Sequence, residues 1–74
     1  MAKWIKFVLI KEGEKTNVWR VVTEERNEVL GEIKWLGRWR KYAFFPSPET
    51  VYEDDCLKDI AEFIEQQMIE RKHR

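Results

Sequence analysis

The sequence predicts an α+β fold in which a three- to four-stranded antiparallel sheet (β-β-β-β-α) packs against one C-terminal amphipathic helix. Short runs rich in β-branched and aromatic residues alternate with Gly, Asn and charged residues as far as Pro46. Beyond Pro48, apolar residues recur at spacings of 3 and 4, which is the helical period. The chain has 74 residues and no repeat or linker, so a single domain is expected over residues 1–74.

Two strands are expected in the first third of the chain. Residues 4–10 are apolar and β-prone, and they stop at a polar cluster in which Gly13 is free to adopt a positive φ. Residues 18–23 make the second strand, which is followed by a charged connection containing Asn27. The apolar run over residues 4–10 is too short, and too interrupted by Lys6, for a signal peptide or a membrane span.

Residues 29–35 and 39–45 are expected to form the third and fourth strands. Gly37 would give the flexibility for a tight hairpin between them, and Pro46 would end the sheet because it cannot donate to a strand ladder. With residues 36–39 as the hairpin loop, Ile33 opposes Tyr42 and Gly31 opposes Phe44.

This register assigns each side chain to a face of the sheet. It groups Ile33, Tyr42 and Phe44 as core, and a shift of one residue would invert the assignment. The opposite face would show Glu32, Lys34, Lys41, Ala43 and Phe45. Gly31 would let a neighbouring aromatic ring lie over the backbone.

The C-terminal helix has the clearest signals. Thr50 and Glu53 have the spacing of a capping box, and Glu53, Asp54 and Asp55 place negative charge at the positive end of the helix dipole. The residues expected to face the sheet are Leu57, Ile60, Ala61, Ile64 and Met68, flanked by Cys56 and Phe63. Those expected to face away are Lys58, Asp59, Glu62, Glu65 and Gln66.

Charge is balanced overall but unevenly distributed. The chain has 14 Lys and Arg against 14 Asp and Glu. Residues 1–46 are rich in cations and residues 47–74 in acids, which predicts a basic sheet and an acidic helix. The candidate nucleic-acid or partner surface lies on the last hairpin and consists of Lys34, Arg38, Trp39, Arg40 and Lys41. The alternative is that the cations only solvate the sheet and that the tryptophans belong to the core.

The sequence also resembles a family of short uncharacterised proteins of bacteria, archaea and phages, often encoded beside mobile-element genes. The resemblance covers residues 18–66 and implies no activity. It rests on Leu30-Gly31-Glu32-Ile33-Lys34-Trp35, Trp39-Arg40-Lys41-Tyr42-Ala43-Phe44-Phe45-Pro46, Thr50-Val51-Tyr52 and Cys56-Leu57-Lys58-Asp59-Ile60. A looser likeness, in topology alone, is to the sheet-plus-helix DNA readers of the integrase N-terminal type.

No enzymatic site is predicted. Asp55, Asp59 and Glu62 fall at helical spacings, but solvated helix surface explains them better than a metal site does. Cys56 near a helix N-terminus is expected to be a core residue rather than a reactive thiolate. The single histidine, His73, lies in the charged C-terminal run. We therefore expect no catalytic residues, no metal and no cofactor.

These observations favour a cytoplasmic, non-enzymatic accessory or protein-interaction module of phage or mobile-element origin. One cysteine fits a reducing compartment. Ten aromatic residues in so small a fold favour a patch that binds a protein partner or a second copy. The alternative function is nucleic-acid binding through the basic Trp and Arg hairpin. No membrane association is expected.

Overall fold

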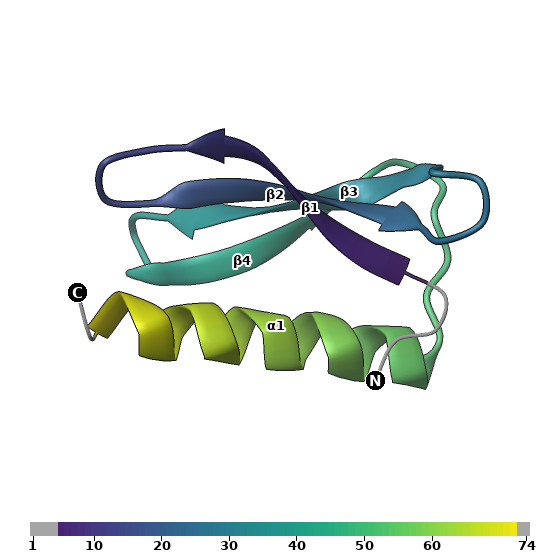
Figure 1. Ribbon diagram of the computed structural model, residues 1–74. Helices are drawn as coiled ribbons and strands as arrows, with labels where there is room; N and C mark the ends of the chain where they lie inside the picture. Colours follow the sequence, from purple (N-terminus) through teal and green to yellow (C-terminus); the bar gives the residue numbers. More distant parts are fainter. Residues whose placement is uncertain (1–4, 73–74) are drawn as a thin grey trace.

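The computed structural model describes residues 5–72. Four strands, β1 (Ile5–Glu12), β2 (Asn17–Thr23), β3 (Val29–Leu36) and β4 (Lys41–Pro46), precede one helix, α1 (Asp54–Lys72). The strands form one antiparallel sheet in the order β1-β2-β3-β4, and α1 lies against one face of it (Figure 1). The α+β prediction is confirmed. Trp4, the first residue of the first predicted strand, and His73 lie outside the described residues.

The turns do not use glycine as predicted. No glycine has a positive φ, whereas Asn27, Arg40 and Glu49 do. Gly13 is needed for close approach instead, because its N–H donates to the Thr16 carbonyl at 2.9 Å and a Cβ would lie 2.5 Å from that oxygen. The prediction of a positive φ at Gly13 was therefore wrong, whereas Gly37 does lie in the β3–β4 turn, without a positive φ.

The β3–β4 hairpin has a later turn than predicted, over residues 37–40. Tyr42 therefore opposes Trp35, and Phe44 opposes Ile33. The predicted pairs were wrong by two residues. The predicted faces were nevertheless right, because a shift of two leaves every side chain on its own face.

The core lies between the sheet and α1. Val21 and Ile33 are fully buried at its centre. Phe63 of α1 stacks on Phe7 with ring centroids 4.1 Å apart and meets the edge of Trp19 at 5.1 Å. The other buried members of this cluster are Ile5, Tyr42, Cys56 and Ile60.

Gly31 has the packing role that the sequence predicted. A Cβ at this position would lie 2.7 Å from an atom of the Phe44 ring and 2.5 Å from the Phe45 carbonyl oxygen. The ring of Phe44 therefore occupies the space of the missing side chain. Tyr52 meets Phe44 edge-on, and its hydroxyl donates to the Leu30 carbonyl, which ties the β4–α1 connection to β3.

The helix begins later than the predicted capping box. The Glu53 carboxylate accepts from the backbone N–H of Cys56 at 2.7 Å, so Glu53 is itself the N-cap. The Thr50 hydroxyl instead donates to the Ser47 carbonyl at 2.8 Å. The capping-box prediction was wrong because Thr50 forms its hydrogen bond within the β4–α1 connection and does not cap the helix.

The buried side of α1 is also rotated from the predicted one. Asp59 is buried, although it was expected to face away, and Leu57 and Ala61 are exposed. The rotation follows from Phe63, whose contacts with Phe7 and Trp19 centre the helix on the row of Cys56, Ile60 and Phe63.

Candidate functional site

The face of the sheet opposite α1 carries no covering element in the described chain (Figure 1). Its residues follow from the register, because Trp19, Ile33 and Phe44 lie on the core face and their strand neighbours point the other way. We call this surface the open face. It consists of Lys6, Val8, Lys11, Val18, Arg20, Val22, Val29, Glu32, Lys34, Leu36, Lys41, Ala43 and Phe45.

The ionic side chains of the open face are nearly all basic. Its one acid, Glu32, lies 3.4 Å from the Arg20 guanidinium on the neighbouring strand, so these two charges offset each other. The Lys34 ammonium lies 4.7 Å from the centroid of the Phe45 ring, which is a cation–π contact at the surface. The remaining cations are Lys6, Lys11 and Lys41.

The turn between β3 and β4 extends this surface beyond the sheet. Backbone N–H groups of Trp39 and Arg40 donate to the carbonyls of Leu36 and Gly37, each at 3.2 Å. The side chains of Arg38, Trp39 and Arg40 are exposed, and Trp39 has 65% of its surface accessible. Within residues 5–72, none of these three side chains makes a hydrogen bond, ion pair or ring contact.

The structure places all five predicted site residues on one continuous part of the surface. Arg38, Trp39 and Arg40 form the tip of the hairpin. Lys34 pairs with Ala43 and Lys41 pairs with Leu36, so the two lysines are diagonal neighbours on the open face just below the tip. All five are exposed, as a binding surface requires.

Sequence reasoning missed three further cations on the same face, Lys6, Lys11 and Arg20. Alternation along the first two strands could have placed Lys6 and Arg20. Lys11 could not have been placed, because the register shifts between Leu9 and Lys11 and this irregularity brings Lys11 opposite Val18.

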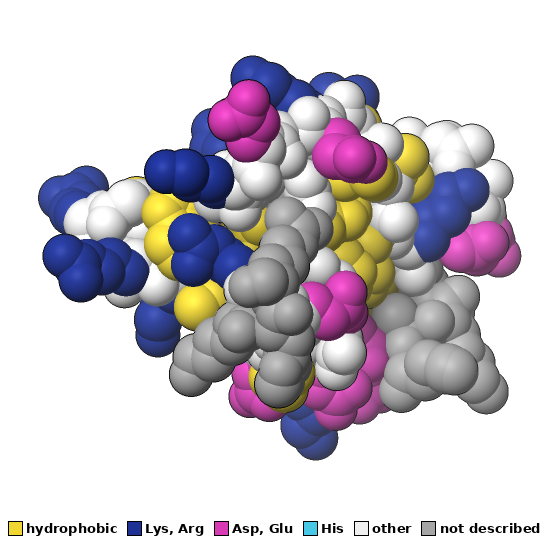
Figure 2. Space-filling view, turned by 60° about the vertical axis from the view of Figure 1, so that its left-hand side comes forward, with side chains coloured by type: hydrophobic (Ala, Val, Ile, Leu, Met, Phe, Trp, Pro, Cys, Tyr) yellow, Lys and Arg dark blue, Asp and Glu magenta, His cyan; other side chains and the backbone are white. Residues whose placement is uncertain are grey.

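The charges separate in space as well as in sequence. In Figure 2 the Lys and Arg side chains gather on the left around a hydrophobic patch, while many acids lie lower down. The β1–β2 and β3–β4 turns lie at one end of the sheet together with the last turn of α1 (Figure 1). The opposite end carries Glu24, Glu25, Glu28, Glu49, Glu53, Asp54 and Asp55.

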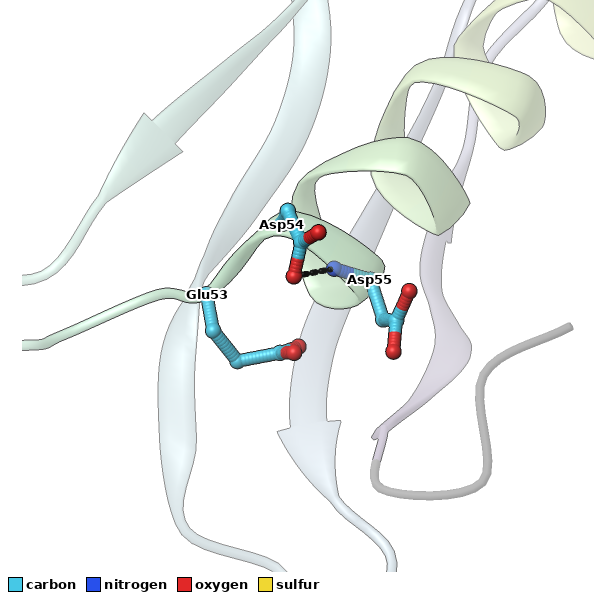
Figure 3. A group of neighbouring side chains, drawn as sticks. All are labelled: Glu53, Asp54 and Asp55. Carbon is cyan, nitrogen blue, oxygen red and sulfur yellow. Dashed lines mark hydrogen bonds between the residues drawn. The ribbon is translucent and has the colours of Figure 1, made fainter.

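Three exposed acids gather where α1 begins, namely Glu53, Asp54 and Asp55 (Figure 3). The Asp54 carboxylate accepts from the N–H of Asp55 at 3.0 Å. Hydrogen bonds from Cys56 lower the pKa of Glu53. The carboxylates of Glu53 and Asp54 thus accept from backbone donors of the first helical turn, and all three acids lie at the positive end of the helix dipole.

The thiol of Cys56 is buried beside this helix cap. Burial raises its pKa to about 11, and the Glu53 carboxylate acts in the same direction. The thiol is therefore protonated near neutral pH, which agrees with the predicted core role.

The fold and its surface define a small α+β domain with one covered and one open sheet face. No family model and no solved structure matches the sequence. The chain is 37% identical over 71 residues to the "Uncharacterized 9.3 kDa protein" of Acholeplasma phage L2, an alignment that covers 95% of this chain and 91% of the phage protein. The chain belongs to the family of this small phage protein. No helix in the described part of the chain is long and apolar enough to cross a membrane.

Proposed function

We propose that the protein is a non-enzymatic accessory module of phage or mobile-element origin that binds nucleic acid. The observation that carries this proposal is the charge of the open face and the hairpin tip. Together they hold one acid, Glu32, and the cations Lys6, Lys11, Arg20, Lys34, Arg38, Arg40 and Lys41. Such a surface attracts phosphates locally even though the molecule as a whole has no net charge.

The hairpin tip adds a second kind of contact. Trp39 is an indole with 65% of its surface exposed, placed between two arginines. Exposed aromatic rings stack on bases, and arginines bind the phosphates beside them. The covered face of the sheet and the acidic end of the molecule would point away from the ligand.

Three features support a binding role rather than a catalytic one. The Cys56 thiol is buried, with a pKa of about 11, so it is not a nucleophile at neutral pH. The exposed carboxylates of Glu53 and Asp54 are engaged as helix caps. The open face itself offers ammonium and guanidinium groups, which hold anions but are poor general bases.

The test is fluorescence anisotropy of labelled single- and double-stranded DNA and RNA at low and moderate salt. The double variant Arg38→Ala/Arg40→Ala should bind at least about tenfold more weakly and with a shallower salt dependence. The matched control is Arg26→Ala/Lys58→Ala, which removes two cations from the far end and the helix surface and should bind like the wild type. Equal affinities of the two double variants would contradict the proposal.

Trp39→Ala separates stacking from charge. Loss of base stacking costs about 1–3 kcal/mol, so affinity for single strands should fall about five- to hundredfold with the salt dependence unchanged. Quenching of tryptophan emission on binding should disappear in the same variant. An unchanged affinity would remove Trp39 from the interface.

A protein partner, which the sequence favoured over nucleic acid, is the second candidate. One specific observation supports it, the exposure of Val8, Leu9 and Ile10 by 41%, 47% and 40% on consecutive residues of β1. An apolar run at a sheet edge is a common site for strand addition. Association through β1 should survive Arg38→Ala/Arg40→Ala, whereas nucleic-acid binding should not.

A further inference from the structure

The two edge strands of the sheet, β1 and β4, differ in how readily another strand could pair with them. β4 is six residues long, begins at Lys41 and ends at Pro46, and both residues discourage further pairing. β1 is eight residues long, contains no proline and pairs only with β2; its regular part, before the shift between Leu9 and Lys11, runs from Ile5 to Leu9 and includes one lysine. Its other edge has no strand beside it in the described chain. Val8, Leu9 and Ile10 are the exposed apolar residues along it.

We propose that a second copy of the chain occupies this edge, by antiparallel pairing of β1 with β1 about a two-fold axis at Val8. The two sheets would join into one. This inference deepens the second candidate function by naming the partner, and it rests on that candidate alone. Nucleic-acid binding is independent of it.

The residues of β1 suit this register. Val8 would face its counterpart on the open side, and Phe7 would face the partner's Leu9 on the core side. Lys6 would lie beside the irregular segment of the partner at Ile10, so it meets no like charge there. A closed two-fold pairing also removes the exposed edge from both copies.

The groove beside β1 supplies a place for the partner's side chains. An open groove of about 490 Å³ runs between β1 and α1, and its lining includes Ile5, Phe7 and Phe63. Because Leu9 of the second copy would lie opposite Phe7 on the core side, it would enter this groove. Leu9 would then gain a buried environment in place of its present exposure of 47%.

Charge complementarity supports the antiparallel orientation. One end of the molecule carries Arg38 and Arg40 in the β3–β4 turn, beside a β1–β2 turn in which Glu14 and Lys15 balance, and the other end is acidic at the β2–β3 turn and at the start of α1. The two ends are those of the sheet in Figure 1. A two-fold axis across β1 would reverse one copy relative to the other, so the basic end of each would lie beside the acidic end of its partner. Such an arrangement favours this dimer over a parallel one.

Sedimentation equilibrium tests the inference directly. The wild type should sediment as a dimer, and Val8→Lys should sediment as a monomer because two lysines would then face each other at the axis. Val51→Lys is the matched control, since Val51 is 91% exposed and lies outside β1. A wild-type chain that stays monomeric at its highest soluble concentration would overturn the proposal.

Cross-linking covers the case in which Val8→Lys fails to fold. Val8→Cys should give a covalent dimer with a short bismaleimide, whereas Val51→Cys and the wild type, whose Cys56 is buried, should not. Equal cross-linking of the two cysteine variants would also overturn the β1 interface. A monomer that still binds oligonucleotides would contradict the dimer only, and a dimer that binds none would contradict the nucleic-acid proposal only.

Discussion

The guanidinium of Arg71 lies over the ring of Trp35, 4.1 Å from the ring centroid. Trp35 in turn meets the edge of Tyr42, with centroids 5.4 Å apart. Arg71 belongs to the last turn of α1, where a cation also complements the helix dipole. The contacts among these three side chains therefore hold the C-terminal end of α1 against β3 and β4.

Arg71→Ala should lower the free energy of unfolding by about 1 kcal/mol, because it removes a cation–π contact and a favourable charge at the helix end. Urea unfolding followed by circular dichroism measures the change. Lys58→Ala is the control, since Lys58 is exposed on the same helix. If the two variants unfold at the same urea concentration, the contact of Arg71 with Trp35 does not stabilise the fold.

Gly31→Ala should destabilise the fold by about 1–3 kcal/mol, because a Cβ there would overlap the Phe44 ring and the Phe45 carbonyl. Gly37→Ala is the matched control. A Cβ at Gly37 meets nothing within 4 Å, and the residue has no positive φ. That substitution should be neutral or stabilise by up to about 1 kcal/mol. Thermal unfolding of both variants decides between these outcomes, and a reversed order would refute the packing argument.

Arg40→Gly should separate stability from binding. Arg40 has a φ of 53°, which glycine adopts without strain, so the variant should be at least as stable as the wild type. Its oligonucleotide affinity should nevertheless fall, since a cation is lost from the hairpin tip. Asn27→Gly, at a φ of 54° in the acidic β2–β3 turn, should leave affinity unchanged. If Arg40→Gly is less stable than the wild type, the positive φ of Arg40 does not strain the backbone.

Alkaline pH should weaken the fold through Cys56. The thiol pKa is raised from an ordinary 9.0 to about 11, so the folded chain holds the proton more tightly than the unfolded chain does. The resulting stability is fully present below the ordinary pKa and is lost as pH rises through about 11. Urea midpoints of the wild type and Cys56→Ala should therefore converge between about pH 9 and 11. A constant difference across that range would contradict the raised pKa.

The sequence predicted the faces of the sheet better than its register. Alternation along each strand, with a predicted register of the right parity, places Ile33, Tyr42 and Phe44 on one side, and this held although the turn came later than predicted. What decided the turn was backbone conformation at Arg40, a residue with no intrinsic preference for a positive φ. In the same way, only tertiary contacts of Phe63 determine which row of α1 is buried.

The part of the candidate site that consists of consecutive residues could be predicted from the sequence. Residues 38–40 are consecutive and polar around one tryptophan, so the hairpin tip could be recognised directly. The wider basic face joins Lys6, Arg20 and Lys34 from three strands, and that requires the pairing register. Lys11 reaches this face only because β1 is irregular at Ile10, which no pattern in the sequence signals.

The strand order has a consequence for how the molecule assembles. Every strand pairs with its neighbour along the chain, so each step of sheet formation closes only a short loop. The helix, in contrast, follows all four strands in the chain and packs across the face that they form together. Until α1 emerges, the nascent sheet exposes Trp19, Ile33 and Tyr42. We therefore expect a variant without α1 to expose the apolar core face and to aggregate.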